Sequence, residues 1–152
     1  MHSVFFFREN TTNVRSLTLE PKMGIMFWST WSNLEPTAAP NHAAIFYSWM
    51  DGSNSSLLIQ NELNWPNGLT FDYKNLVLYW VDTSLNKLEK LHMSWSEDKT
   101  KLNLIERKSV DADAKFISGP YGLALHKDVL YWTEFMNGNI NKYDLNTYQT
   151  ER

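Results

Sequence analysis

Along this chain, apolar residues recur at every second position, which is the spacing of β-strands and not of helices. Near the middle, residues 68–72 alternate small or polar with apolar side chains, 76–81 form a nearly continuous apolar run, and 101–106 alternate again. A short apolar run is typical of a strand buried on both faces, and alternation is typical of a strand with one wet face. With the more polar stretch 86–91, this unit is predicted to contain four strands.

The same order of strands is predicted on either side of this unit. The preceding unit has strands expected at residues 16–20, 25–28, 44–48 and 56–60. The following unit has strands expected at residues 121–125, 129–132 and 139–143, and the chain ends about where a fourth would begin. Loops are expected at residues 30–43, 94–100 and 109–118. No helix of ordinary length is predicted.

One tetrapeptide recurs with the units, as Phe27-Trp28-Ser29-Thr30, Tyr79-Trp80-Val81-Asp82 and Tyr131-Trp132-Thr133-Glu134. The spacing is constant, because 52 positions separate Trp28 from Trp80 and Trp80 from Trp132. A fixed period of this size indicates a repeat architecture, whose units bury their hydrophobic faces against one another.

Four-stranded units in tandem favour a β-propeller over a flat solenoid. The predicted fold class is therefore all-β, with about three four-stranded blades of an incomplete ring. The predicted division is a tail of a preceding blade at residues 1–12 and blades at 13–62, 63–108 and 109–152, the last one incomplete. Three blades do not close a ring, so the two open blade faces are expected to need another copy or further sequence to cover them.

Composition narrows the choice of partners. The hydrophobic fraction of 43% and the aromatic fraction of 14% supply a real core. The net charge is −3 and no basic stripe is visible, which argues against nucleic acid as a partner. The chain has no cysteine, so disulfides, thiolate metal sites and cysteine nucleophiles are excluded. No run approaches the ~18 apolar residues of a membrane helix, so direct membrane insertion by this segment is not expected.

Several segments together resemble the YWTD-repeat propellers of the low-density lipoprotein receptor family. Residues 65–72, Trp-Pro-Asn-Gly-Leu-Thr-Phe-Asp, are similar to the first-strand segment of that family, and residues 120–125 repeat it in the next unit. Tyr79-Trp80-Val81-Asp82 is similar to the second-strand signature, and residues 50–54 to the turn between the third and fourth strands.

This resemblance implies a six-bladed propeller in the extracellular part of a single-pass receptor, at the plasma membrane and in endosomes, with EGF-like modules flanking it in the parent chain. It implies a protein ligand bound through propeller loops, and a role in ligand capture, acid-triggered release or Wnt co-reception. Thr30 and Glu134 depart from the signature Asp that Asp82 keeps, so looser blade contacts are expected near Thr30. His126 stands where Asp72 does in the preceding unit.

The recurring signature residues are interpreted as blade-packing positions and not as an aromatic binding platform or an acid/base pair. They are Phe27, Trp28, Tyr79, Trp80, Asp82, Tyr131, Trp132 and Glu134. Two N-glycosylation sequons begin at Asn54 and Asn10, and Asn54 directly follows an Asp-Gly turn. Trp65, before a first strand, and Trp95, in a predicted polar loop, are the candidates for a ligand surface. Neither His92 nor His126 has metal-ligand spacing, and a pH-sensing role for either is the minor reading.

Two other functions stay open. The first is an extracellular matrix propeller, similar to nidogen, that binds another matrix protein. The second is a metal-dependent propeller hydrolase, which would need His, Asp, Glu or Asn side chains converging from several first strands. Asn67 and Tyr121 occupy roughly equivalent positions there and do not form such a set. No nucleophile elbow, phosphate loop, zinc signature or calcium loop occurs, so neither an enzyme nor a cofactor is predicted.

Overall fold

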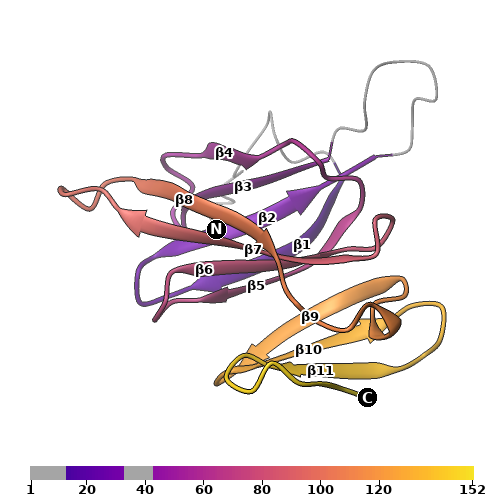
Figure 1. The fold of residues 1–152 in the computed structure, drawn as a ribbon. Helices are drawn as coiled ribbons and strands as arrows, with labels where there is room; N and C mark the ends of the chain where they lie inside the picture. The colour runs from indigo at the N-terminus through magenta and orange to yellow at the C-terminus, as the bar shows by residue number, and fades with distance from the viewer. Residues whose placement is uncertain (1–12, 33–42) are drawn as a thin grey trace, which may run out of the picture.

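The fold is known from a computed structural model that describes residues 13–32 and 43–152 (Figure 1). It contains three four-stranded antiparallel sheets, which we call blades 1, 2 and 3. Blade 1 consists of β1 (Val14–Glu20), β2 (Ile25–Thr30), β3 (Ala44–Trp49) and β4 (Ser56–Ile59). Blade 2 consists of β5 (Pro66–Asp72), β6 (Val77–Asp82), β7 (Lys87–Trp95) and β8 (Leu102–Ser109). Blade 3 consists of β9 (Pro120–His126), β10 (Val129–Glu134), β11 (Ile140–Asp144) and β12 (Thr150–Glu151).

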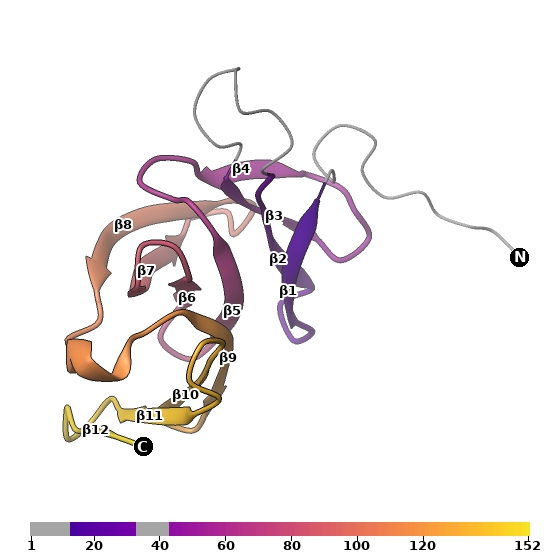
Figure 2. The same cartoon turned by 90° about the vertical axis from the view of Figure 1, so that its right-hand side faces the viewer.

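Each blade is a simple meander in which consecutive strands pair. Figure 2 shows the three blades fanned about one side, where the innermost strands β1, β5 and β9 lie next to one another. The only helical element among the described residues is the 3-10 turn η1 (Ala114–Phe116), in the link between blades 2 and 3. The predicted all-β partial propeller is therefore confirmed.

Several strand boundaries differ from the prediction, and two of them have the same physical reason. Strand β7 continues to Trp95 and β8 continues to Ser109, although residues 94–100 and 109–118 were expected to be loops. Ladder pairing extends both strands, because Trp95 lies opposite Leu102 and Ser109 lies opposite Glu89. Cross-strand pairing and burial outweigh the polar local sequence here. The expected tail at 1–12 lies outside the described residues, as does most of the loop at 30–43.

The hydrophobic core lies between the blades. One cluster joins blades 1 and 2 and contains Phe27, Ile45, Phe71, Leu78 and Trp80, among others. A second cluster joins blades 2 and 3 and contains Val77, Tyr79, Val81, Leu130 and Trp132, among others. Strand β6 contributes to both clusters, with successive side chains pointing to opposite faces. This explains its continuous apolar sequence, since every residue of β6 is buried.

The innermost strands approach one another closely at Gly68 of β5. A Cβ atom at this position would lie 2.6 Å from the carbonyl oxygen of Tyr121 and 2.8 Å from the backbone nitrogen of Leu123, both in β9. No side chain fits against backbone at such a distance. The glycine therefore sets how tightly blade 3 packs on blade 2.

Candidate functional site

The three signature tryptophans are buried in the blades, with exposed fractions of 2% for Trp28, 0% for Trp80 and 1% for Trp132. The Trp132 indole donates a 2.9 Å hydrogen bond to the carbonyl of Phe116 in the link from blade 2. The indole nitrogen of Trp80 has no hydrogen-bond partner among the described residues, and the guanidinium of Arg107 lies 5.1 Å from its ring centroid. These rings have the burial of core residues and are not accessible as a binding platform.

In blades 1 and 2, the aromatic residue before the tryptophan faces the next blade along the chain. Phe27 is fully buried and its ring lies 4.8 Å from that of Phe71 in blade 2. Tyr79 is 5% exposed and packs in the cluster shared with blade 3. Tyr131, at the same register in the last blade, is 37% exposed. Exposure at this position therefore depends on whether a following blade covers it.

Asp82 is fully buried and holds blade 2 to the link that leads into it from blade 1. Its carboxylate accepts hydrogen bonds from the backbone N–H groups of Asn64 at 2.7 Å and Trp65 at 3.1 Å, both in the link from blade 1. It also accepts one from the N–H of Leu85 at 3.1 Å, in the turn after β6. One carboxylate thus fixes a linker and a turn together, which is a structural role.

Glu134 occupies the equivalent place in blade 3 and is 2% exposed. It accepts a 3.0 Å hydrogen bond from the backbone N–H of Ser118 in the linker and further bonds from the side chains of Asn137 and Asn139. Burial raises the pKa of this carboxyl group, but the hydrogen bonds it accepts outweigh burial and hold the pKa below the ordinary value of 4.5. Thr30, the third residue of this set, is buried, and looser contacts around it stay a prediction.

A comparable change of residue between blades occurs at the other end of the strands, in the turn that joins the first strand of a blade to the second. Asp72, at the end of β5, accepts backbone hydrogen bonds from Lys74 and Asn75 and closes the β5–β6 turn. His126 stands at the corresponding position of blade 3 and is exposed. Asp72, Asp82 and Glu134 belong to separate turns and links, and they do not form one carboxylate pair.

A cluster of aromatic and cationic side chains lies where β2 ends and β5 begins, and we call it the Trp31–Trp65 platform. The two indoles are half-buried and stack with centroids 4.9 Å apart and planes inclined by 15°. The exposed Arg15 places its guanidinium carbon 4.1 Å from the Trp31 ring and donates a 3.3 Å hydrogen bond to the Trp31 carbonyl. Beneath them, the Trp31 indole N–H donates a 2.8 Å hydrogen bond to Oδ1 of the buried Asn67.

The sequence indicated only one member of this platform. Trp65 was a candidate because it precedes a first strand. Arg15 and Trp31 were not among the candidates, because nothing local to either residue indicates that it lies beside Trp65. One signal was present, because Trp31 directly follows the tetrapeptide, at the end of the strand where blade links meet.

Trp95 does not lie in a polar loop as predicted. It is the last residue of β7, is half-buried, and stacks on Trp49 with centroids 5.9 Å apart and an angle of 5° between planes. Both indoles pack against the core between blades 1 and 2. They lie at the end of the strands opposite the platform, because Trp49 pairs with Ile25 at the start of β2. Trp95 is thus a weaker candidate for ligand contact than Trp65.

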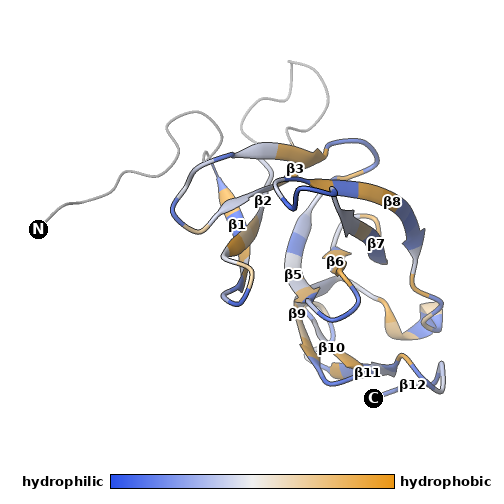
Figure 3. Cartoon of the chain, turned by 90° about the vertical axis from the view of Figure 1, so that its left-hand side faces the viewer, coloured by the Kyte–Doolittle hydropathy of each residue, from blue (hydrophilic) through white to orange (hydrophobic). Residues whose placement is uncertain are grey.

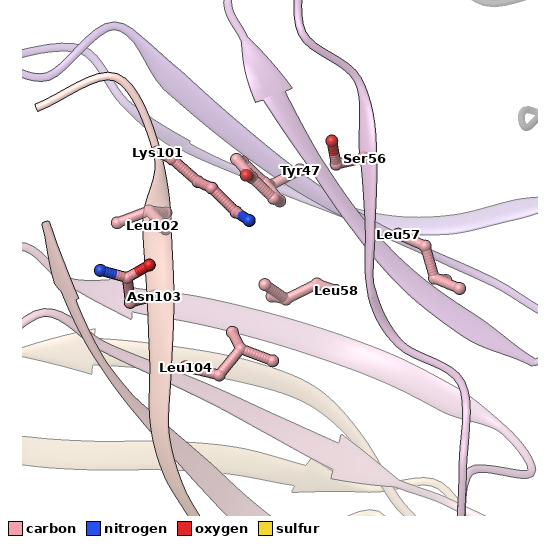
Figure 4. A pocket seen from close by; sticks show the side chains of 8 residues that line it. All are labelled: Tyr47, Ser56, Leu57, Leu58, Lys101, Leu102, Asn103 and Leu104. Atoms are coloured by element: carbon pink, nitrogen blue, oxygen red, sulfur yellow. The ribbon is translucent and has the colours of Figure 1, made fainter. Parts of the chain in front are cut away.

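A groove of about 440 Å³ runs along the outer rim between blades 1 and 2. Figure 4 shows Leu58 of β4 and Leu104 of β8 on its two sides, with Lys101 and Tyr47 at one end. The outer strands of neighbouring blades diverge here. The groove contains no cluster of acidic or histidine side chains that would suggest catalysis.

The structure also gives the positions of Asn54 and His92. Asn54 is exposed in the turn between β3 and β4 and has a φ of 53°. Asn10 lies outside the described residues. His92 is half-buried in β7.

Within residues 13–32 and 43–152, no group of three or more His, Cys, Asp or Glu side chains could hold a metal ion. The same residues include no helix long and apolar enough to cross a bilayer.

Residues 24–73 match the family model of the low-density lipoprotein receptor repeat class B. Among curated proteins, the chain is 28% identical over 127 residues to the vitellogenin receptor Yl of Drosophila melanogaster, covering 84% of this chain and 5% of the receptor. It is 26% identical to the human low-density lipoprotein receptor-related protein 5-like protein, covering 88% of this chain and 46% of that protein. The chain therefore spans well under two thirds of the length of these relatives.

Among solved structures, a chain of the nidogen/laminin complex superposes with a TM-score of 0.71 at 24% identity, covering 96% of this chain and 48% of that chain. This likeness shows the fold. The family match over β2 to β5 and the three stacked sheets lead to one conclusion. The chain is a partial β-propeller that carries a low-density lipoprotein receptor class B repeat.

Proposed function

We propose that this chain is the ligand-capturing propeller segment of an endocytic or signalling receptor related to the low-density lipoprotein receptor. In this proposal the segment lies on the extracellular side of the plasma membrane and in endosomes, and EGF-like modules flank it in a single-pass parent chain. The class B repeat match and two relatives that are named as receptor-type proteins support this assignment.

The Trp31–Trp65 platform is the observation that carries the proposal. Tryptophan and arginine are the residues most enriched in the few positions that dominate protein–protein binding energy. Here two indoles are already stacked, and the hydrogen bond from Trp31 to Asn67 fixes one of them. A partner would meet a surface that needs little ordering, which lowers the entropic cost of association.

Charge favours an acidic or carboxylate-bearing segment of the protein ligand. Arg15 is exposed, its guanidinium lies over the face of Trp31, and it forms no ion pair with a carboxylate of residues 13–32 or 43–152. An incoming carboxylate can take two parallel hydrogen bonds from an arginine fork while an apolar neighbour covers the indoles. The chemistry is non-covalent recognition on a rigid β scaffold.

A matrix role is the second candidate, because the solved structure reported above contains nidogen in complex with laminin. Adhesion and endocytic capture would use the same kind of surface. They differ in the partner and in the modules attached to the propeller.

Binding to two purified proteins tests both candidates. Immobilised chain is titrated with vitellogenin and, separately, with laminin, using biolayer interferometry. We expect vitellogenin to bind, and Arg15→Ala and Trp65→Ala each to weaken binding by about tenfold or more, equivalent to about 1.4 kcal/mol. Lys99→Ala is the matched control, because Lys99 is an exposed cation in the β7–β8 turn at the opposite end.

Binding of laminin alone would favour the matrix role. Equal affinity of all variants would contradict the platform assignment. Failure of both proteins to bind at about 10 μM would count against ligand capture by this segment, since such an affinity corresponds to only about 7 kcal/mol. Circular dichroism confirms that each variant keeps its β signal.

A further inference from the structure

Two asparagines of this chain directly precede a glycine, Asn67 before Gly68 and Asn137 before Gly138. Such a pair can react with itself. The backbone nitrogen of the glycine attacks the Cγ atom of the asparagine, ammonia leaves, and a five-membered succinimide ring forms. Water then opens the ring to aspartate or isoaspartate, so an amide becomes a carboxylate without any other reagent. Glycine favours this reaction because it has no Cβ atom to hinder the attacking nitrogen.

The fold protects Asn67, which is 5% exposed. Both ends of its amide are held, because Oδ1 accepts a 2.8 Å hydrogen bond from Trp31 and Nδ2 donates one of 2.6 Å to Thr83. Figure 3 shows its strand, β5, between β1 and β9. Ring closure would turn the backbone of Asn67 and Gly68 out of a strand that is packed on both sides, so this pair should stay intact.

Asn137 and Gly138 lie in the turn between β10 and β11, and both are exposed. The side chains just before them, Phe135 and Met136, are 70% and 75% exposed, so little buried apolar contact holds the turn closed. The N–H of Gly138 donates a 3.0 Å hydrogen bond to the carbonyl of Glu134. Opening this bond in an exposed turn requires far less free energy than opening a packed strand, and the nitrogen is then free to attack.

The exposure of this turn does not depend on whether another blade follows. Asn137 and Gly138 stand 52 positions after Leu85 and Asn86, which lie in the equivalent turn of blade 2. Blade 3 packs on blade 2, yet Leu85 is 37% exposed and Asn86 is exposed too. The backbone is alike in the two turns, with a φ of 50° at Asn86 and of 65° at Gly138. A following blade would therefore leave the Asn137–Gly138 pair open to water.

Asn137 also contacts the carboxylate that holds blade 3 to its link. Its Nδ2 donates to Oε2 of Glu134 at 3.3 Å, and Asn139 donates to the same oxygen at 3.1 Å. Glu134 in turn accepts the backbone N–H of Ser118 in the link from blade 2. Deamidation would replace a donor by a second carboxylate beside this buried one, and like charges repel. Arg152, whose guanidinium lies 3.6 Å from Glu134, offsets only part of this repulsion.

We propose that Asn137 is a site of spontaneous deamidation in the folded protein, that Asn67 is not, and that the reaction loosens the link from blade 2 to blade 3. The selectivity comes from the fold, because glycine follows both residues. This modification is independent of the proposed ligand capture.

Peptide mapping by mass spectrometry tests the site after the chain has been kept for two weeks at about pH 8 and about 37 °C. We expect the peptide with Asn137 to gain about 1 Da, the difference between an amide and a carboxylic acid, and the peptide with Asn67 to stay unchanged. Methyl transfer by an isoaspartate methyltransferase identifies the isoaspartate product. In about 8 M urea both peptides should gain mass, because the fold no longer protects Asn67.

Gly138→Asn is the matched variant for the reaction. Asparagine adopts the required φ at the equivalent position of blade 2, as Asn86. Mass gain at Asn137 should be slower by about tenfold or more, since a side chain now hinders the attacking nitrogen.

Asn137→Asp tests the consequence, because it carries the product side chain. It should unfold at a lower urea concentration than Asn137→Leu, which loses the same hydrogen bond without adding a charge and has the residue of blade 2, Leu85. Circular dichroism follows both transitions.

A folded chain in which Asn137 gains no mass would overturn the proposal, whatever the chain in urea does. Equal rates at Asn67 and Asn137 in the folded chain would overturn the selectivity. An unchanged rate in Gly138→Asn would exclude the succinimide route, and equal urea midpoints for Asn137→Asp and Asn137→Leu would contradict the loosened link.

Discussion

The indole N–H of Trp31 donates a 2.8 Å hydrogen bond to the side-chain oxygen of Asn67, which ties the end of β2 in blade 1 to the start of β5 in blade 2. The Asn67 amide then donates to the hydroxyl of Thr83 at 2.6 Å, and that hydroxyl donates to the carbonyl of Pro120 in blade 3 at 2.5 Å. Three blades are joined in this way beneath the platform. The surface proposed to bind ligand is thus part of the blade-to-blade structure.

Replacing Asp82 with alanine should cost about 3 kcal/mol of unfolding free energy. The substitution leaves the backbone N–H groups of Asn64, Trp65 and Leu85 without the carboxylate that accepts them in a buried site. Urea titration followed by circular dichroism measures the effect. Asp98→Ala is the control, because Asp98 lies in an exposed turn, and its loss should change stability far less. Equal effects of the two substitutions would contradict the linker role.

Gly68→Ala should destabilise the chain more than Gly122→Ala, the same position one blade later. A Cβ atom at Gly68 would lie 2.6 Å from the backbone oxygen of Tyr121, and backbone cannot move aside cheaply. A Cβ atom at Gly122 would meet only the side chain of Thr133, at 3.1 Å. Overpacking of this kind costs about 1–3 kcal/mol. Thermal unfolding of both variants gives the comparison, and a reversed order would refute the close approach of β5 and β9.

Arg107 should matter more than any exposed ion pair of the outer strands. Its guanidinium lies 2.6 Å from the carboxylate of the buried Glu89 and donates to the carbonyls of Asn61 and Glu62 in the blade link. Arg107→Met should cost about 3 kcal/mol or more, since it leaves a buried carboxylate unpaired. Adding Glu89→Gln to that variant should recover part of the loss, which a double-mutant cycle measures.

Lys108→Met on the same strand is the control for Arg107. Lys108 pairs with Glu106 in the open, and both side chains are about half exposed. Exposed pairs of this kind contribute about 0–1 kcal/mol. If Lys108→Met and Arg107→Met destabilise equally, the link between blades does not depend on the arginine.

Glu134 should make stability fall in acid but not at endosomal pH. Its folded pKa lies below 4.5, so the ionised form stabilises the fold above the unfolded pKa, and this contribution is lost as pH falls through the folded pKa. Between about pH 5 and 6 the group stays ionised. Unfolding free energies measured from about pH 7 to 3 should therefore decline less steeply below pH 4.5 in Glu134→Gln than in the unaltered chain. The same slope in both proteins would show that Glu134 does not contribute.

A glycan is expected at Asn54 when the chain is produced in a secretory host. The side chain is exposed in the β3–β4 turn, and Ser56 completes the sequon. The glycan should appear as added mass that a peptide N-glycosidase removes and that Asn54→Gln prevents. If Asn54→Gln keeps all of the N-linked mass, the glycan is attached at another site, such as the sequon at Asn10.

Much of the blade architecture could be predicted because the signal is periodic. A large ring at Trp28, Trp80 and Trp132 must be buried, and a fixed interval between such rings allows only stacked units. The continuous apolar run of β6 likewise indicated burial on both faces, which its two clusters explain.

The platform could not be predicted in the same way. Arg15, Trp31 and Trp65 come from two blades, and only the packing of one blade on the next brings them together. Trp95 was misplaced for a related reason. Residues 96–100 are polar and suggest a loop, but pairing with β8 carries β7 through Trp95. Contacts between distant segments decide both cases, and no local pattern records them.

The platform depends on the order in which the blades stack. Nuclear Overhauser contacts in a sample with labelled aromatic and methyl groups test this order most directly. Contacts are expected between the rings of Phe27 and Phe71, whose centroids lie 4.8 Å apart, and between the Tyr79 ring and the Leu125 methyl groups of the same core. Observation of both sets confirms that blade 1 packs on blade 2 and blade 2 on blade 3. Their absence in a folded sample with assigned resonances would contradict the propeller and the functions built on it.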